Sequence, residues 1–462
     1  MKYAIFTFDG YGLPIAWHLL NEGHEVYVGV VQEAKDTRTS LESSLPPESG
    51  EERDRRLSLY DGMLDKVPAE QLIERLKKVK NRDEWFLFFD LNHLFNFTQE
   101  LCLLGFRGNF PTEDDYLLEI DRELAKAYVA EHYPQVRVAP VKRFNRAAEA
   151  KKFLKDTEEL WVLKGLAEDA RTVVPDVEDV GLAAGQILDA LAQNPDEYEN
   201  AGYLLELMIP NVMELTPQCI FYDGKPISYV MCIENKQIGS GNIGPMTDCA
   251  HDFVYTTDPA EKINQIAFPP IVHERAATHR GLFYWDASLL IDSRTGRIYF
   301  GEFCANRPGY NSIYTEMTLA GSSHKYFDSL ANGKNPLPAN QVAISSRIFN
   351  LQHDDSGEAK SGLAVNYNPK IEDNLWLFDV TKRRNKLVCA GYRDCVGVVT
   401  GVGHSVGEAA RRLHRGIDQF SFEGAYYRPQ FDLVSREYKD SIVNRLNYAL
   451  QRGLTRVGFG ID

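Results

Sequence analysis

The segment 2–31 constrains the fold more than any other. "KYAIFTF" at 2–8 is an apolar run typical of a buried strand, "DGYGLP" predicts a turn, and "IAWHLLNEG" predicts a helix before a second strand, "HEVYVGVV", at 24–31. A strand, a helix and a strand in this order predict a βαβ unit with a right-handed crossover in a parallel sheet. We therefore expect a doubly wound α/β domain over residues 1–115.

The rest of the chain is long enough for further domains. At 462 residues, a chain is expected to form two to four cores. We predict an α+β region over 116–335 and, after the linker "PLPAN", a small mixed α+β domain over 336–462.

Composition argues against several classes of partner. The chain has 51 Lys and Arg against 66 Asp and Glu, a formal net charge of −15, which disfavours a broad surface for nucleic acid or an anionic membrane. We see neither a signal-peptide pattern nor the ~20 apolar residues of a membrane span. Seven cysteines without a close Cys/His grouping indicate reduced thiols. We expect a cytoplasmic protein.

Two hairpins are predicted in the middle region, at 217–235 with an Asp-Gly turn and at 282–303. In the second, Asp286 and Glu302 can lie opposite each other on neighbouring strands and face one space. Two such carboxylates repel each other unless a cation lies between them, and oxygen ligands suit Mg²⁺ that also holds phosphates. The alternative is two solvated acids on a surface hairpin, and the pair alone does not decide.

Other features suggest a nucleotide. Lys164 ends the buried strand "LWVLK", where it either finds a counter-charge or faces phosphates. Glu214 is spaced to reach ribose hydroxyls while the preceding backbone meets an adenine. The adenine contacts would come from Glu206, Leu207, Met208 and Ile209. The Gly-rich loop "NKQIGSGNIGPMT" permits close approach of backbone to a ligand, although such a loop alone is weak evidence.

In this order the elements resemble an ATP-grasp ligase, and most closely the glycinamide ribonucleotide synthetases, also called phosphoribosylamine–glycine ligases. "VLK", "YLLELMI", the Gly-rich loop and "FGEFCANRPG" at 300–309 are similar to that family's lysine strand, hinge, Gly-rich loop and metal motif. "VGVVTGVGHSVGEAARRLHRGIDQFSFEGAYYRPQFD" at 396–432 is similar to its C-terminal domain. The resemblance implies an ATP-grasp fold and ADP-forming ligation of a carboxylate to an amine.

The resemblance also implies roles for individual residues. Lys164 would hold the phosphates of ATP and Glu214 its ribose, while Lys236 and Arg307 would stabilise charge on the transferred group. Cys304 stands where the family has a metal-binding Asn, and a thiol is a poor ligand for Mg²⁺. The ligands of Mg²⁺ (or Mn²⁺) would then be Asp286, Glu302 and Asn306. The partners would be a small carboxylate and an amine, and a homodimer is compatible with the sequence.

Departures from the family pattern affect the expected substrate. The family holds a phosphoribosyl group with an arginine in its first turn, whereas this turn contains Asp9 and Tyr11 and no arginine. We therefore expect poor activity with phosphoribosylamine and better activity with an uncharged or cationic amine. The acyl donor would be a small amino acid or a similar carboxylate.

Three other interpretations remain open. One is a true phosphoribosylamine–glycine ligase of purine biosynthesis. Another is a catalytically degenerate ATP-grasp scaffold or nucleotide sensor, which Cys304 and the altered flap "GLAEDARTVV" at 165–174 favour. The third is a dinucleotide-dependent oxidoreductase, which the missing third glycine in "DGYGLP" disfavours.

Overall fold

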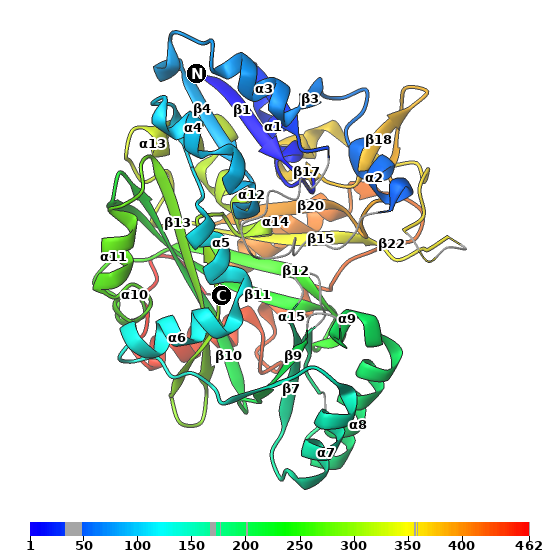
Figure 1. Cartoon of the computed structure of the whole chain (residues 1–462). Helices are drawn as coiled ribbons and strands as arrows, with labels where there is room; N and C mark the ends of the chain where they lie inside the picture. The colour runs from blue at the N-terminus through cyan, green and yellow to red at the C-terminus, as the bar shows by residue number, and fades with distance from the viewer. Residues whose placement is uncertain are drawn as a thin grey trace.

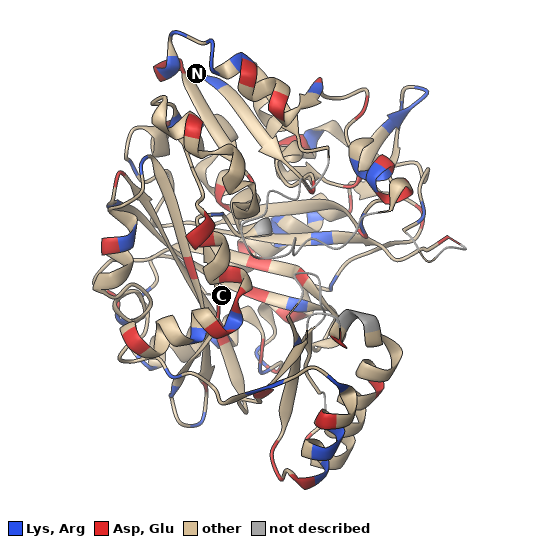
Figure 2. Ribbon diagram, in the orientation of Figure 1, with Lys and Arg blue, Asp and Glu red and all other residues tan. Residues whose placement is uncertain are grey.

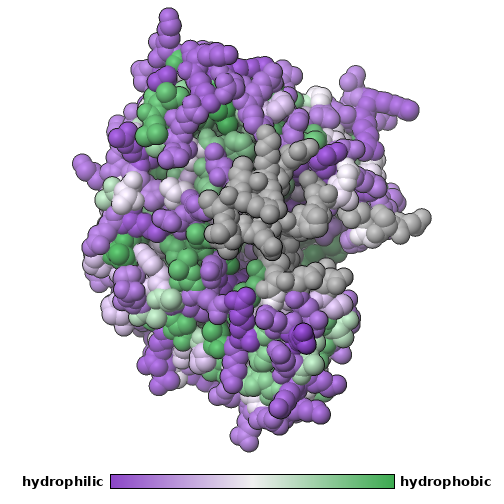
Figure 3. Space-filling model, viewed as in Figure 1, coloured by the Kyte–Doolittle hydropathy of each residue, from purple (hydrophilic) through white to green (hydrophobic). Residues whose placement is uncertain are grey.

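The computed structural model describes residues 1–32, 49–166, 172–175, 177–199, 202–354, 357 and 359–461. Figure 1 shows an N-terminal sheet with its helices at the top, a large sheet across the middle and a small lobe at the lower right. On the face shown in Figure 3, hydrophilic residues predominate around the grey atoms, and apolar residues form scattered patches, some of them over the small lobe. Within the described residues, no helix is both long and apolar enough to cross a membrane.

The N-terminal part is a parallel sheet, as the sequence predicts. Its strands are β1 (Lys2–Thr7), β2 (Val26–Val30), β3 (Lys66–Pro68), β4 (Trp85–Phe89) and β5 (Arg107–Gly108), in the order β3-β2-β1-β4-β5. The helical segments are α1 (Leu13–Asn21), α2 (Gly50–Leu57), α3 (Ala69–Leu76), η1 (Arg82–Glu84), η2 (Asn92–Phe97) and α4 (Gln99–Leu103). Tyr3 and Ile5 of β1 join one core and Ala4 and Phe6 another. Burial on both faces explains the continuous apolar run of this strand.

Two helices follow and lead to the small lobe. They are α5 (Glu113–Ile120) and α6 (Arg122–His132). The lobe contains the antiparallel strands β6 (Val141–Phe144), β7 (Trp161–Gly165), β8 (Thr172–Val173) and β9 (Tyr203–Leu207), in the order β6-β9-β7-β8, with helices α7 (Ala147–Asp156), α8 (Val180–Gln193) and α9 (Pro195–Glu199). Leu163 and Leu205 of the sheet pack with Ile187 and Leu191 of α8 in a separate core.

The large sheet contains both predicted hairpins. Its strands are β10 (Val212–Tyr222), β11 (Lys225–Gly239), β12 (Ile243–Thr256), β13 (Leu282–Asp292), β14 (Ile298–Ala305), β15 (Val342–Asn350), β17 (Leu375–Leu377), β20 (Cys395–Gly403) and β22 (Ala425–Tyr426). The order is β14-β13-β10-β11-β12-β15-β20-β17, and β22 pairs with β15. Asp223 and Gly224 form the first turn with φ of 45° and 75°, the left-handed values of a tight hairpin turn.

The sheet is continuous across residue 336. Asp252 of β12 pairs with Ser345 of β15, so the predicted boundary between the second and third domains cuts through one sheet. The helices packed around it are α10 (Lys262–Ala267), α11 (Pro270–Ala276), α12 (Tyr310–Ala320), α13 (Ser323–Ala331), α14 (Val406–Ile417), α15 (Phe431–Val434) and α16 (Ile442–Gln451). Shorter elements complete the fold: β16 (Asn366–Tyr367), η3 (Pro369–Asn374), β18 (Val380–Arg383), β19 (Lys386–Cys389) and β21 (Phe420–Ser421).

Candidate active site

One lysine on the large sheet lies among three carboxylates. The Lys236 Nζ of β11 is 2.9 Å from the Glu214 Oε1 of β10, 3.2 Å from the Glu302 Oε1 of β14 and 3.7 Å from the Glu234 Oε2. Figure 2 shows Asp and Glu gathered at the centre of the molecule, where these strands run past α5. The structure therefore brings together Glu214, Lys236 and Glu302, three residues that the sequence singled out separately.

This arrangement changes the proton affinities of its members. Lys236 holds the pKa of Glu302 down to about 2, against the effect of burial. Burial raises the pKa of Glu234 to about 7, and Lys236 offsets only part of that rise. Three carboxylates share one ammonium group, so the cluster has a surplus of negative charge when all of them are ionised.

The β13–β14 hairpin corrects the expected pairing of the two predicted metal ligands. Asp286 pairs with Cys304 rather than with Glu302. A register shift between Ala287 and Leu289 leaves the Gly301–Glu302 segment beside Ser288, and a Cβ on Gly301 would lie 2.6 Å from the Ser288 Oγ. A larger residue at position 301 would therefore require the Ser288 side chain to shift.

Asp286 is more deeply buried than Glu302. Its side chain is 5% exposed, whereas that of Glu302 is 48% exposed. Burial and the neighbouring Glu234 raise the pKa of Asp286 well above its ordinary value, while Arg307 and Lys236 oppose them. The proximity of a cation would lower that pKa.

Asn306 and Arg307 lie behind the sheet edge, against α5. Asn306 is fully buried with a φ of 54°, and its Nδ2 donates to the Phe110 carbonyl (3.1 Å) and to the Asp115 Oδ2 (2.9 Å). The Arg307 Nε donates to the Glu119 Oε1 at 2.7 Å. Asn306 thus has a structural task that the sequence did not reveal, and its role as a metal ligand stays a prediction.

Asp115 is the centre of this buried network. Besides Asn306, its carboxylate accepts hydrogen bonds from the Arg275 Nη2 (2.7 Å), the His279 Nε2 (3.0 Å) and the Thr112 N–H (3.0 Å). Although burial raises it, His279 and Arg275 hold the pKa of Asp115 far below its usual range. The network fixes the turn after β14 and so the position of Arg307.

A second charged cluster lies between α6 and the small lobe. Glu206 of β9, a buried side chain, lies between the Lys126 Nζ of α6 (2.6 Å) and the Lys164 Nζ of β7 (3.2 Å). Burial lowers the pKa of Lys164, and Glu206 offsets part of that effect. The sequence reasoning missed Lys126 and its neighbour Arg122, although two cations four residues apart on α6 were a readable signal because they share a helix face.

Part of the backbone that is predicted to contact an adenine already forms hydrogen bonds within the protein. The Leu207 N–H donates to the Pro140 carbonyl and the Met208 N–H to the Leu160 carbonyl, both at 2.9 Å. In this conformation these two N–H groups are not available to a ligand. Of the flap predicted at 165–174, residues 167–171 lie outside the described residues.

A narrow cavity separates the two clusters. Its lining includes Arg122 and Lys126 of α6, Lys164 of β7 and Glu302 of β14. Its volume is about 10 Å³, room for about one water molecule. The cations Arg122, Lys126 and Lys164 and one predicted metal ligand, Glu302, therefore line the same narrow gap.

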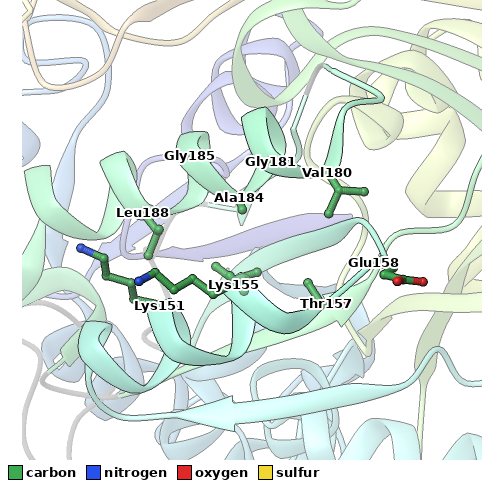
Figure 4. A pocket seen from close by; sticks show the side chains of 10 residues that line it. Lys151, Lys155, Thr157, Glu158, Val180, Gly181, Ala184, Gly185 and Leu188 are labelled. Carbon is green, nitrogen blue, oxygen red and sulfur yellow. The ribbon is translucent and has the colours of Figure 1, made fainter.

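A larger cavity lies elsewhere, between α7 and α8 of the small lobe. Figure 4 shows Lys151 and Lys155 on one side of it and Ala184 and Leu188 on the other. Its volume is about 570 Å³. Since the predicted site residues do not line it, size alone does not identify the active site.

The first turn has a cation that the sequence did not reveal. The Asp9 Oδ1 accepts a hydrogen bond from the Tyr392 hydroxyl (3.0 Å) and lies 3.5 Å from the Arg393 Nη2. The expectation of an uncharged or cationic acceptor rested on the absence of an arginine from the turn itself. Arg393, 384 residues away in the chain, places a cation beside the turn, and the preferred acceptor stays a prediction.

Solved structures share this architecture over nearly the whole chain. A phosphoribosylamine–glycine ligase from Thermotoga maritima superposes with a TM-score of 0.64 at 16% identity, covering 93% of this chain and 99% of the other. A biotin carboxylase from Campylobacter jejuni, solved with a β,γ-ATP complex, gives 0.58 at 16% identity, with 92% of each chain covered. The biotin carboxylase domain of 2-oxoglutarate carboxylase from Hydrogenobacter thermophilus, a dimer with MgADP and bicarbonate, gives 0.58 at 14% identity, covering 98% and 95%.

These likenesses show the fold. The chain has the ATP-grasp fold, in the arrangement that phosphoribosylamine–glycine ligases and biotin carboxylases share. No protein-family model matches the sequence, and the comparison with curated proteins gives no match.

We predict that Asp115→Ala lowers the free energy of unfolding by about 3–5 kcal/mol, because it leaves Arg275 and His279 without their buried counter-charge. Urea denaturation at pH 7 measures the change. Asp114→Ala, at an exposed neighbouring position, is the control and should change stability by less than about 0.5 kcal/mol. Equal effects of the two substitutions would contradict the network.

We also predict a pH-dependent difference between the wild type and Glu234→Gln. The folded protein keeps Glu234 protonated up to a pKa of about 7, against an ordinary value of 4.5. The contribution of Glu234 to the free energy of unfolding is therefore fully present below pH 4.5 and is lost as the pH rises from 4.5 to 7. Denaturation midpoints across pH 4–8 should fall more steeply for the wild type. Parallel profiles would show that Glu234 does not titrate there.

Proposed function

We propose that the protein is an ADP-forming ligase that joins a carboxylate to an amine at the gap between the small lobe and the large sheet. The main support for this proposal is that two clusters with opposite excess charge lie next to each other. Lys126, Lys164 and Arg122 line the gap on one side, and Glu302, one of the carboxylates around Lys236, lines it on the other. A nucleotide's phosphates with a divalent cation match both sides.

The donor set fits a magnesium or manganese ion, which supplies charge stabilisation when it is bound. Glu302 and Asp286 would hold it, with Asn306 as the predicted third ligand. Within the described residues, His, Cys, Asp and Glu side chains do not form a preassembled group of three able to hold a metal ion. Such a site fits an ion that keeps several waters and arrives with substrate phosphates.

The nucleotide would lie between the lobes. Lys164, Lys126 and Arg122 would bind its phosphates, and Glu214, whose Oε1 already accepts a hydrogen bond from the Ser288 Oγ at 2.6 Å, would bind its ribose. The adenine would meet Glu206, Leu207, Met208 and Ile209 through groups other than the Leu207 and Met208 N–H groups, which are already hydrogen-bonded. Because the gap holds about one water, the small lobe must move outward for a nucleotide to enter.

Two steps would follow. A substrate carboxylate oxygen attacks the γ-phosphorus of ATP, and the bond to ADP breaks. The acceptor amine then attacks the acyl phosphate, and the C–O bond to phosphate breaks with its electron pair. An ammonium acceptor loses two protons: one leaves on the phosphate and the other passes to solvent. Lys236 and Arg307 would stabilise the charge on the transferred group, mainly by position.

Two alternatives keep some support. Glycinamide ribonucleotide formation is supported by Arg393, which places a cation beside the first turn. A role as a scaffold or nucleotide sensor is supported by Cys304. This residue pairs with Asp286 at a position where a ligase is expected to have a better metal ligand than a thiol.

The ligase function is tested by ADP release from Mg-ATP with a panel of small amino acids and amines. We predict that Glu302→Gln lowers turnover by roughly 10²–10³-fold, as the loss of one charge-stabilising group does, and weakens ATP binding much less. Calorimetry with ATP and Mg²⁺ gives the binding constants.

Glu423→Gln, at an exposed position, is the matched control and should keep full activity. Absence of ATP binding in the wild type would contradict the proposal. ATP binding without ADP release for any substrate would instead favour the sensor.

A further inference from the structure

Side chains from outside the large sheet hold the segment of β11 that carries Lys236. The register between β11 and β12 shifts between Asn235 and Gln237 and again between Gln237 and Gly239. Lys236 lies at the first of these shifts, and a break of this kind disrupts the ladder of backbone hydrogen bonds locally. Other contacts are therefore needed to fix the backbone at this point.

Arg445 of α16 holds the residues that precede Lys236. Its Nη1 donates to the Glu234 carbonyl at 2.7 Å, and its Nη2 donates to the Asn235 Oδ1. Arg445 is 5% exposed. Burial lowers the pKa of Arg445, and Glu214 of the Lys236 cluster is the largest charge that opposes this effect. Arg445 therefore contacts the strand directly before Lys236 and compensates part of the negative charge of the cluster.

Arg428 holds the residues that follow Lys236. The Arg428 Nη1 donates to the Gln237 carbonyl at 2.8 Å, and its Nη2 donates to the Asn242 Oδ1 at 2.7 Å. Its Nε donates to the Asp432 Oδ2 of α15 at 2.7 Å, and both members of this ion pair are fully buried. The rigid fork of one guanidinium thus joins the two ends of the Gly-rich loop between β11 and β12.

The carboxylate of Asp432 fixes the tip of the same loop. Its Oδ1 accepts hydrogen bonds from the Ser240 Oγ at 3.1 Å and from the Gly241 N–H at 3.2 Å. Gly241 and Asn242 have φ of 74° and 57°, left-handed values that glycine and asparagine tolerate. In this conformation the Gly241 N–H therefore serves Asp432 and is not available to a ligand.

We propose that Arg428 and Arg445 are positioning residues, which hold the backbone on either side of Lys236 and so place its ammonium group. The inference rests on the proposed ligase function, in which Lys236 stabilises charge on the transferred group. A displacement of ~1 Å in such a site can lower a rate by about a hundredfold. The C-terminal segment 428–445 thus contributes to the reaction without touching the substrate.

A purely structural role of the two arginines leads to a different result. Loss of an arginine would then lower the free energy of unfolding but leave kcat of the folded enzyme unchanged. A positioning role lowers kcat and leaves ATP binding nearly unchanged, because Lys236 acts on charge that develops during the transfer.

The first test compares Arg445→Gln with the wild type by steady-state ADP release and by calorimetric titration with ATP and Mg²⁺. We expect kcat to fall roughly tenfold to a hundredfold, while the dissociation constant for ATP changes by less than about threefold. Arg445→Lys keeps the charge and should recover part of the lost kcat. Arg411→Gln, at an exposed position on α14, is the control and should change neither quantity.

A second variant tests the loop and leaves every buried charge paired. Asn242→Gly removes one acceptor of Arg428 and keeps a residue that adopts a positive φ. We expect kcat to fall roughly twofold to tenfold, the range for one hydrogen bond. Asn385→Gly is the matched control, because Asn385 has a φ of 62° in an exposed turn, and its kcat should equal that of the wild type.

Crystal structures of the nucleotide-free wild type and Arg445→Gln locate Lys236 without any turnover. We expect its Nζ to move by ~1 Å or more from its place beside Glu214 in the variant. Unchanged kcat in both Arg445→Gln and Asn242→Gly, an ATP dissociation constant that rises as much as kcat falls, or an unmoved Nζ would overturn the inference. Absence of ADP release by the wild type would overturn the ligase proposal instead, and the position of the Nζ would still decide whether Arg445 places Lys236.

Discussion

The placement of one ammonium group among three carboxylates is the interaction on which the rest of this site depends. Lys236 lies within 4 Å of Glu214, Glu234 and Glu302, which come from three different strands of the large sheet. Those contacts require β10, β11 and β14 to show the same face, and they leave more negative than positive charge. The cluster can lose that excess by protonation, as the raised pKa of Glu234 shows, or by binding a cation.

On the other side of the gap the excess charge is positive. Lys126 and Lys164 share the single carboxylate of Glu206, with Arg122 close by. Each side of the gap therefore has an excess charge that the other side, or a ligand between them, can balance. Phosphates with a divalent cation would satisfy both, which is why the ATP-grasp fold and the charges of this chain support the same proposal.

Sequence reasoning could reach features that are local. The hairpins follow from short turn signals such as Asp223-Gly224, and the βαβ start follows from its apolar runs. Lys164 and Glu302 were recognisable because charged residues ended apolar strands. Long-range features were not readable: Arg393 meets Asp9 across the fold, and the register shift beside Gly301 depends on how two strands pack. The part that the Asn306 amide nitrogen plays in the Asp115 network could not be predicted either, and its role as a metal ligand stays a prediction.

The central claim is that the gap between the lobes binds a metal–nucleotide complex. A crystal structure with a non-hydrolysable ATP analogue and Mn²⁺, with anomalous diffraction data, tests it most directly. We expect the manganese peak beside Glu302 and Asp286, the phosphates against Lys164 and Lys126, and an outward displacement of the small lobe. A nucleotide in the cavity between α7 and α8, or a manganese peak remote from Glu302, would contradict the account.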